Sequence, residues 1–354
     1  METAILRLMS DILLAVECGD FAALVLLHLS TAFDTVDHVI LLRRLQTSFG
    51  TDGFALDWFQ SCLVGRTNDL TPHLYADDTE VYSSCSPCDA DSFRTRVSQC
   101  TCAVVEWMQS NRLQLNCNKT DFAWLTTNRS LRRLPTTGPT IGSVTVVPSQ
   151  TLCELGVYID ADLTMRTHVQ RIASRGFTVL RRLCSIRHYF PTSMFRSLVS
   201  AFVLNRLDYC NSLLVDLPAV LLQRHQAVQN SVARLIYRLR RSEHITDALL
   251  SLHWLRVQER IEYKVAVLTY KALNGLAPPY LSTAFTRVAD MSSRRLRSAS
   301  TDQPLVPSYR RPTIGQRAFP IARHVSLRRY VCSIAGHLPA AVEDRTFSPL
   351  LQCF

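Results

Sequence analysis

Apolar and polar positions follow two different periods along this chain, and the period changes near residue 164. Residues 21–29 form an apolar run of strand length, the pattern of a strand buried on both faces. Beyond residue 164, apolar residues recur every three or four positions, which is the spacing of one buried helix face. The segments with this spacing are 164–187, 191–205, 218–241 and 257–274. The pattern predicts an α+β protein with a helical second half.

Further elements are predicted around the apolar run in the first half. Residues 73–82 place two short apolar and aromatic arms on either side of Asp77 and Asp78, which predicts a tight β-hairpin. From Phe93 to Trp107 apolar residues mark one face of a helix, which Asp91 or Ser92 can cap. Helices are also predicted over 39–49 and 55–64, and strands over 121–126 and 155–159. Gly138, Gly142 and nearby prolines predict a loop or hairpin between these two strands, over 127–154.

Charge divides the chain into an acidic and a basic part. The net charge is +10, but residues 1–130 hold nine Lys+Arg against 16 Asp+Glu, a balance of −7, and residues 131–354 hold 30 against 13, a balance of +17. All but three of the cations are arginine, whose planar guanidinium suits phosphate. This distribution fits a metal site joined to a polyanion-binding module, although a coding bias towards arginine would produce the same composition.

Composition excludes several classes of protein. With 47% hydrophobic and 19% charged residues, the chain can form a folded core. Its longest unbroken apolar run is seven residues, residues 21–27, whereas crossing a bilayer takes roughly 20. Glu2, Asp11 and Glu17 do not suit a secretory signal. We therefore expect no membrane partner and an intracellular protein, nuclear or cytoplasmic.

Cysteine and histidine spacing does not predict a metal centre. Cys85, Cys88, Cys100 and Cys102 follow a CxxC and CxC pattern that matches zinc-ribbon spacing poorly. Without a secretory signal, stable disulfides are not expected either. The histidines of the helical half, His225, His244 and His253, have no matched set of carboxylates or cysteines, so we interpret them as structural.

The adjacent carboxylates Asp77 and Asp78 are the sharpest chemical feature. Two negative charges at a hairpin tip repel each other unless a cation lies between them, and Mg²⁺ prefers such oxygen ligands. Aspartate is also a common turn residue, so the pair alone predicts only a turn.

The order of motifs along the chain resembles the reverse transcriptases of non-LTR, LINE-type retrotransposons, which are RNA-directed DNA polymerases. The resemblance runs from about residue 10 to the C-terminus. It implies a partial polymerase palm over residues 1–163, a helical thumb-like region over 164–283 and an Arg/Ser/Pro-rich, partly disordered region over 284–354, with a mobile stretch at 290–317. The segments that carry it are LVLLHLSTAFDTVDHVILLRRL (24–45), HLYADDTEVY (73–82), WMQSNRLQLNCNKTD (107–121), LGVYID (155–160), RLDYCNSLL (206–214), LHWLRVQERI (252–261) and YKALNGLAPPYL (270–281).

The resemblance also implies roles for individual residues. Asp77 and Asp78 match the catalytic aspartates that hold Mg²⁺, and Lys119 matches a lysine that assists the leaving pyrophosphate. The implied partner is an RNA or DNA template–primer, cradled by the arginine-rich helices. The other matched positions are Phe33 and Tyr75 at the nucleotide, and Leu155 and Gly156 in the hairpin that grips the primer end.

Two departures from the family pattern bear on catalysis. The position of the third metal carboxylate holds His28, whose neutral imidazole cannot bridge two hard cations. The stretch between Arg66 and His73 is too short to contain the family's template- and nucleotide-positioning segment. We therefore expect a reverse transcriptase-like protein that is catalytically defective. Two alternatives stay open: a non-catalytic nucleic-acid-binding protein that uses the arginine-rich helical half, and a relic without selected function.

Overall fold

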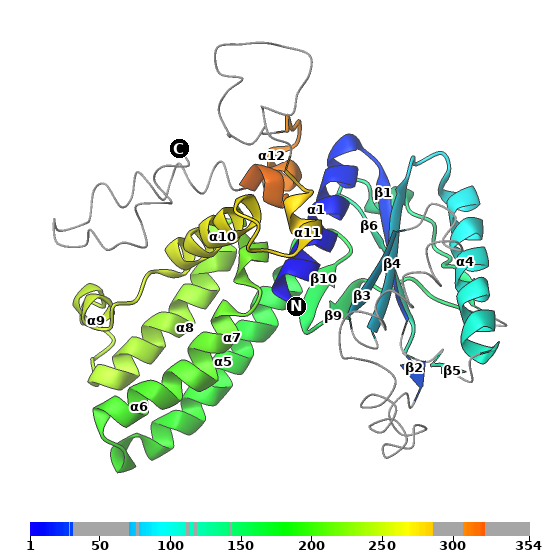
Figure 1. Cartoon of the computed structure of the whole chain (residues 1–354). Helices are drawn as coiled ribbons and strands as arrows, with labels where there is room; N and C mark the ends of the chain where they lie inside the picture. The colour runs from blue at the N-terminus through cyan, green and yellow to red at the C-terminus, as the bar shows by residue number, and fades with distance from the viewer. Residues whose placement is uncertain are drawn as a thin grey trace, which may run out of the picture. The chain divides into compact units, whose positions relative to one another are not determined.

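The computed structural model describes residues 1–27, 29–30, 71–75, 78–110, 114–116, 119–141, 144–285 and 307–322. It has the predicted α+β composition, with antiparallel sheets in the first half and helices in the second (Figure 1). Contacts divide the chain into two compact units, and we describe each by itself. The first contains Met1 and residues 14–164, and the second contains residues 2–13 and everything from Met165 onward.

A four-stranded antiparallel sheet with the order β3-β4-β1-β6 forms the centre of the first unit. The central strand β1 (Phe21–Leu27) is buried along its whole length, which confirms the strand predicted from the apolar run. The predicted hairpin is β3 (Thr71–Tyr75) and β4 (Asp78–Cys85), and the strand predicted at 121–126 is β6 (Asp121–Leu125).

Helix α4 (Ala90–Ser110) contributes to the core on one face of this sheet (Figure 1). Alternate residues of β1, from Phe21 to Leu27, join the same buried cluster as Phe93, Val97, Cys100 and Val104 of the helix. Trp124 of β6 lies within the cluster, with its ring 5.8 Å from that of Phe93. Side chains at every third or fourth position of α4 therefore pack against side chains at every second position of the strands, and together they form one apolar layer.

Short hairpins complete the first unit. The strand predicted over 155–159 is instead β10 (Val157–Asp160), because Leu155 and Gly156 have positive φ and form the turn before it. Its partner β9 (Thr151–Glu154) was not predicted. The segment over 127–154, predicted as a loop or hairpin, contains a small hairpin of β7 (Thr140–Ile141) and β8 (Val144–Thr145). The remaining short strands are β2 (Leu29–Ser30) and β5 (Gln114–Leu115).

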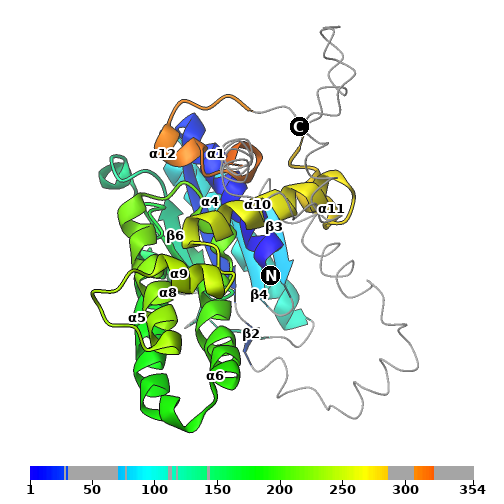
Figure 2. The same ribbon diagram turned by 90° about the vertical axis from the view of Figure 1, so that its left-hand side faces the viewer.

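The second unit is helical, as the three- and four-residue spacing predicts. The long helices α5 (Arg166–Ile186), α8 (Ala219–Tyr237) and α10 (Val257–Leu273) lie within the predicted segments. Figure 2 shows α5 and α8 side by side with α6 (Thr192–Val199). The predicted helix over 191–205 continues from α6 through a π-helical turn (Ser200–Leu204) into α7 (Asn205–Asp208). Shorter helices are α9 (Thr246–Ser251), α11 (Pro279–Ser282) and α12 (Pro312–Gly315).

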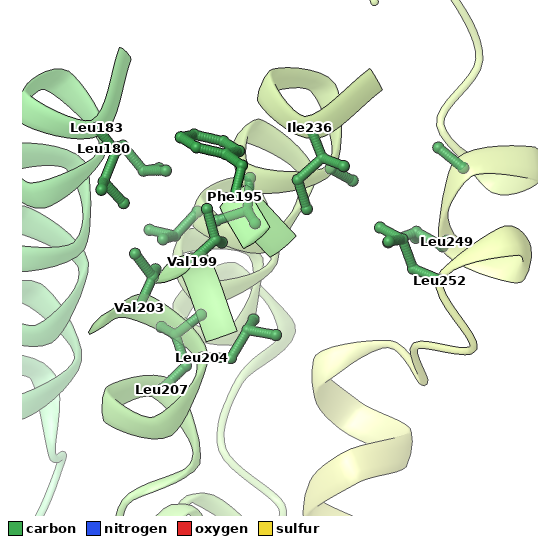
Figure 3. Packing of buried hydrophobic residues seen from close by; sticks show 14 of the residues in the cluster. Leu180, Leu183, Phe195, Val199, Val203, Leu204, Leu207, Ile236, Leu249 and Leu252 are labelled. Atoms are coloured by element: carbon green, nitrogen blue, oxygen red, sulfur yellow. The ribbon is translucent and has the colours of Figure 1, made fainter. Parts of the chain in front are cut away.

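The core of this bundle consists of aliphatic side chains around the buried ring of Phe195, with the partly buried rings of Phe177, Phe190 and Trp254 packed against it. Phe195 and Val199 of α6 are fully buried, and they pack with leucines of α5 and with Ile236 of α8 (Figure 3). Leu249 and Leu252, from α9 and the residue after it, belong to the same cluster. The apolar stripes that the sequence places on separate helices thus share one core.

Two segments of the second unit differ from the sequence-based expectation. Helix α1 (Glu2–Cys18) was not predicted, and its residues 2–13 belong to this unit. Within the stretch expected to be mobile, residues 307–317 are instead part of a packed segment that continues to residue 322. The reason is apolar burial: Ile314, Phe319 and Ile321 are each less than a tenth exposed, and the Phe319 amide donates a hydrogen bond to Ser10 Oγ (2.9 Å).

Candidate functional site

Three chemically distinctive segments end at one edge of the four-stranded sheet. At the tip of the β3–β4 hairpin Tyr75 pairs with Asp78, and beside it Leu27, the last residue of β1, pairs with Thr79. On the other side of β1, Leu26 pairs with Asp121, the first residue of β6. Because neighbouring strands are antiparallel, the end of β1, the hairpin tip and the start of β6 meet at the same edge.

Lys119 lies two residues before β6 and therefore precedes the strand at this edge. It is exposed, and its backbone amide donates to the carbonyl (3.0 Å) and the Oδ1 (3.2 Å) of Asn116. These bonds close a turn that ends where β6 begins. The register thus brings the backbone positions of Tyr75, Asp78 and Lys119 to one edge.

Glu80 is a carboxylate at this edge that the sequence analysis did not single out. It lies two residues after Asp78 on β4, so both positions belong to the same face of the sheet. Its strand partners are His73 on β3 and Leu26 on β1, and Glu80 is only 1% exposed. The i, i+2 spacing within a predicted strand was a signal that could have identified it.

Several predicted site residues lie outside the described residues. These are Asp77, Phe33 and His28, together with the helices predicted over 39–49 and 55–64. The stretch from Arg66 to residue 70 is outside as well. The roles that the resemblance implies for these residues stay predictions.

The donor atoms that are described do not make up a magnesium site. In the described parts of the chain, no three or more His, Cys, Asp or Glu side chains are close enough together to hold a metal ion. Mg²⁺ requires near-octahedral oxygen coordination, commonly with one or two carboxylates and substrate phosphates. The resemblance implies a third carboxylate where this sequence has His28, and a neutral imidazole does not suit hard cations, so the residues do not fit the implied pair of Mg²⁺ ions.

The β9–β10 hairpin has its turn at Leu155 and Gly156. Their φ angles are 43° and 80°, and Glu154 pairs with Val157 across the turn. Two successive positive φ values are typical of a type I′ turn, which matches the twist of the flanking strands. The hairpin expected from the resemblance is therefore present, and its role at a primer end stays a prediction.

The second unit presents an unusually basic surface. From residue 165 to residue 207 the chain contains eight arginines and no Asp or Glu. Side-chain burial divides these arginines into two groups, seven that are exposed and one that is buried. The exposed arginines are Arg166, Arg171, Arg175, Arg181, Arg182, Arg196 and Arg206.

Arg187 is the buried member, and its guanidinium is held by the fold. It donates hydrogen bonds to the carbonyls of Phe190 and Ile236 and to Thr192 Oγ1, all at 3.1 Å. The guanidinium carbon also lies 4.7 Å from the ring centre of Phe195. This arginine stabilises the bundle and is not available to a ligand, a distinction that composition alone could not make.

A solvent-facing hollow of about 440 Å³ lies along the first half of α5. Guanidinium, hydroxyl and amide groups line it, and these are hydrogen-bond donors suited to phosphate oxygens. The residues that line it are Thr167, Gln170, Arg171, Ser174 and Arg175. The hollow belongs to the same basic helix that carries five of the exposed arginines.

No protein-family model and no curated protein matches this chain at a significant level. In the described residues, no helix is long and apolar enough to cross a membrane.

Proposed function

We propose that this chain is a polynucleotide-binding protein that uses α5 to α7, and that it is derived from a reverse transcriptase without retaining polymerase activity. The observation that carries the proposal is the set of seven exposed arginines between residues 165 and 207, a stretch without a single acidic residue. Phosphate backbones bind such surfaces because each neutralised phosphate releases condensed counterions.

The register of the sheet supports the ancestry. A polymerase palm needs its aspartate turn beside the end of a central strand, and here Leu27 of β1 pairs with the residue that follows Asp78. Lys119 precedes the strand on the other side of β1. The backbone positions of Asp78 and Lys119 on either side of β1 support the roles that the motif resemblance implies for them.

The ligand chemistry at the same edge of the sheet supports a loss of polymerase activity. Two-metal phosphoryl transfer needs oxygen ligands that bridge both ions, and His28 supplies none. The short stretch between Arg66 and His73 also leaves no room for a segment that positions template and nucleotide. Binding, by contrast, requires only the basic surface.

The binding proposal is tested by the salt dependence of affinity. Fluorescence anisotropy of the full chain with labelled single-stranded RNA and duplex DNA should give a plot of log K against log salt with a slope of about −3 or steeper. Arg181→Gln/Arg182→Gln should make the slope for duplex DNA shallower by about 1 to 2, because each lost phosphate contact contributes roughly 0.9.

A matched double variant in the first unit provides the control. Arg94→Gln/Arg96→Gln removes the same charge from α4, where Arg94 is 3.5 Å from Asp91 and Arg96 lies over the ring of Phe93. It should leave the slope unchanged. A slope near zero for the wild type, or equal changes in both double variants, would contradict the proposal.

Primer extension tests the polymerase part. With an RNA template, a DNA primer, deoxynucleotides and either Mg²⁺ or Mn²⁺, we expect no extension product. Incorporation that disappears in Asp77→Ala would show that the aspartate turn still catalyses and would overturn the proposed inactivity.

A further inference from the structure

Two cysteines flank the junction between β4 and α4, in the sequence Cys85-Ser86-Pro87-Cys88. The strand β4 ends at Cys85 and the helix α4 begins at Ala90. Between them the Asp89 amide donates to the Ser86 carbonyl (3.0 Å), which closes a four-residue turn with Pro87 at its second position. Proline favours this position because its φ is already fixed there. The turn therefore holds the chain between the two thiols in a defined conformation.

The two thiols lie in different environments. Cys85 is 7% exposed, pairs with Phe21 of β1 and belongs to the apolar cluster of the first unit, whereas Cys88 is exposed. Burial raises the pKa of Cys85 to about 11, the charges of Asp20 and Asp89 add to this, and Arg96 acts in the opposite direction. The closed turn over residues 86–89 keeps Cys88 close to the end of β4, where Cys85 lies.

A hydrogen bond joins Cys88 to the turn. The Ser86 hydroxyl and the Cys88 thiol share a hydrogen bond in which either group can be the donor. Cys88 is nevertheless exposed, so a disulfide in solution can reach its sulfur. The thiolate is the form that attacks a disulfide. Cys88 is thus the accessible attacking thiol, and Cys85 is the shielded partner next to it.

We propose that Cys85 and Cys88 form a redox-active pair, which low-molecular-weight disulfides such as oxidised glutathione convert reversibly to an intramolecular disulfide. The CxxC spacing is that of thiol–disulfide exchange sites. In a reducing compartment such a disulfide forms only transiently. This inference is independent of polynucleotide binding.

The reaction takes place in two exchange steps. The Cys88 thiolate attacks one sulfur of the disulfide RSSR, its S–S bond breaks, and the RS⁻ that leaves takes up the proton lost by Cys88. The Cys85 thiol then loses its proton, and its thiolate attacks the Cys88 sulfur of the mixed disulfide and releases a second RS⁻, which is protonated. Two electrons pass from the cysteine pair to RSSR, and the products are one protein disulfide and two RSH.

A redox titration of the full wild-type chain tests the proposal. The protein is equilibrated in glutathione buffers of graded ratio, quenched in acid, denatured, alkylated and mapped by mass spectrometry. We expect the peptide that spans residues 85–88 to lose two hydrogen masses and both cysteines to become protected together. Cys100 and Cys102 of α4 should remain alkylatable and serve as the internal control. Free Cys85 and Cys88 in the most oxidising buffer would overturn the proposal.

Variants test the assigned order of attack. In Cys85→Ser the reaction should stop at a glutathione mixed disulfide on Cys88, and in Cys88→Ser the buried Cys85 should stay reduced. Asp20→Asn should speed the release of the second glutathione by lowering the pKa of Cys85, whereas Asp91→Asn, an exposed carboxylate on α4, should not. Equal accumulation of the mixed disulfide in the wild type and in Cys85→Ser would contradict the intramolecular step.

Discussion

A buried histidine of α8 makes the stability of the second unit depend on pH. His225 is 1% exposed, and burial lowers its pKa to about 4, although the Val169 backbone offsets part of the shift. An unfolded histidine titrates near 6.5, so as the pH falls below that value the unfolded chain gains a proton that the folded chain does not. We expect the free energy of unfolding to be fully retained above about pH 6.5 and to lose about 3 kcal/mol towards pH 4, measured by urea unfolding across that range.

The control for this prediction is an exposed histidine of the same unit. His225→Leu should flatten the pH profile between 6.5 and 4, whereas His244→Leu should keep its wild-type slope because His244 is exposed. Parallel profiles for the wild type and His225→Leu would show that another group causes the pH dependence. The interpretation of His225 as structural agrees with its complete burial.

Gly176 of α5 lies directly against α8. A Cβ at this position would lie 2.9 Å from Cγ1 of Val228 on α8, which is fully buried. Gly176→Ala gains about 1 kcal/mol of helix propensity but overpacks the contact by about 1–3 kcal/mol, so we expect a net loss near 1 kcal/mol. Chemical denaturation of the variant measures this loss.

Once the clash with Val228 is removed, Gly176→Ala should raise the free energy of unfolding instead of lowering it. In the background of Val228→Ala, Gly176→Ala should stabilise the protein by up to about 1 kcal/mol, because only the helix-propensity gain remains. If Gly176→Ala changed the free energy of unfolding equally in the wild type and in Val228→Ala, the contact between α5 and α8 would not restrict the size of the residue at position 176.

On the scale of the whole chain, residues near the N-terminus belong to the second unit with residues hundreds of positions away. The Glu2 carboxylate accepts hydrogen bonds from the Ser212 amide (3.3 Å) and hydroxyl (2.7 Å) and lies 2.8 Å from Lys264 Nζ. Ser10 accepts a hydrogen bond from Phe319. Deleting residues 1–13 should therefore destabilise the second unit by at least about 3 kcal/mol, which faster hydrogen exchange in α8 and α10 would reveal.

A point variant separates the charge contacts from the rest of the helix. Glu2→Gln should cost only about 1–2 kcal/mol, because the apolar side chains of α1 stay in place. Unchanged protection of α8 and α10 in the deletion variant would contradict the assignment of residues 2–13 to the second unit.

The sequence by itself determined most of the individual elements, because a helix or strand that buries one face leaves a local period. The strand β1, the β3–β4 hairpin and helices α4, α5, α8 and α10 follow from such periods. Helix α1 went unrecognised although its apolar residues have helical spacing, and β9 is too short to leave a clear alternation. The motifs likewise singled out Asp78 and Lys119 without any knowledge of their neighbours, and the roles assigned to them stay predictions.

Only the tertiary structure decided which of these residues meet and which are buried. Strand order and register bring the hairpin tip, the end of β1 and the start of β6 to one edge, and they place Glu80 on the face of Asp78. Burial sets Arg187 apart from the seven exposed arginines and distinguishes Cys85 from Cys88. These outcomes depend on contacts between residues far apart along the chain, and a local period carries no information about its distant partner.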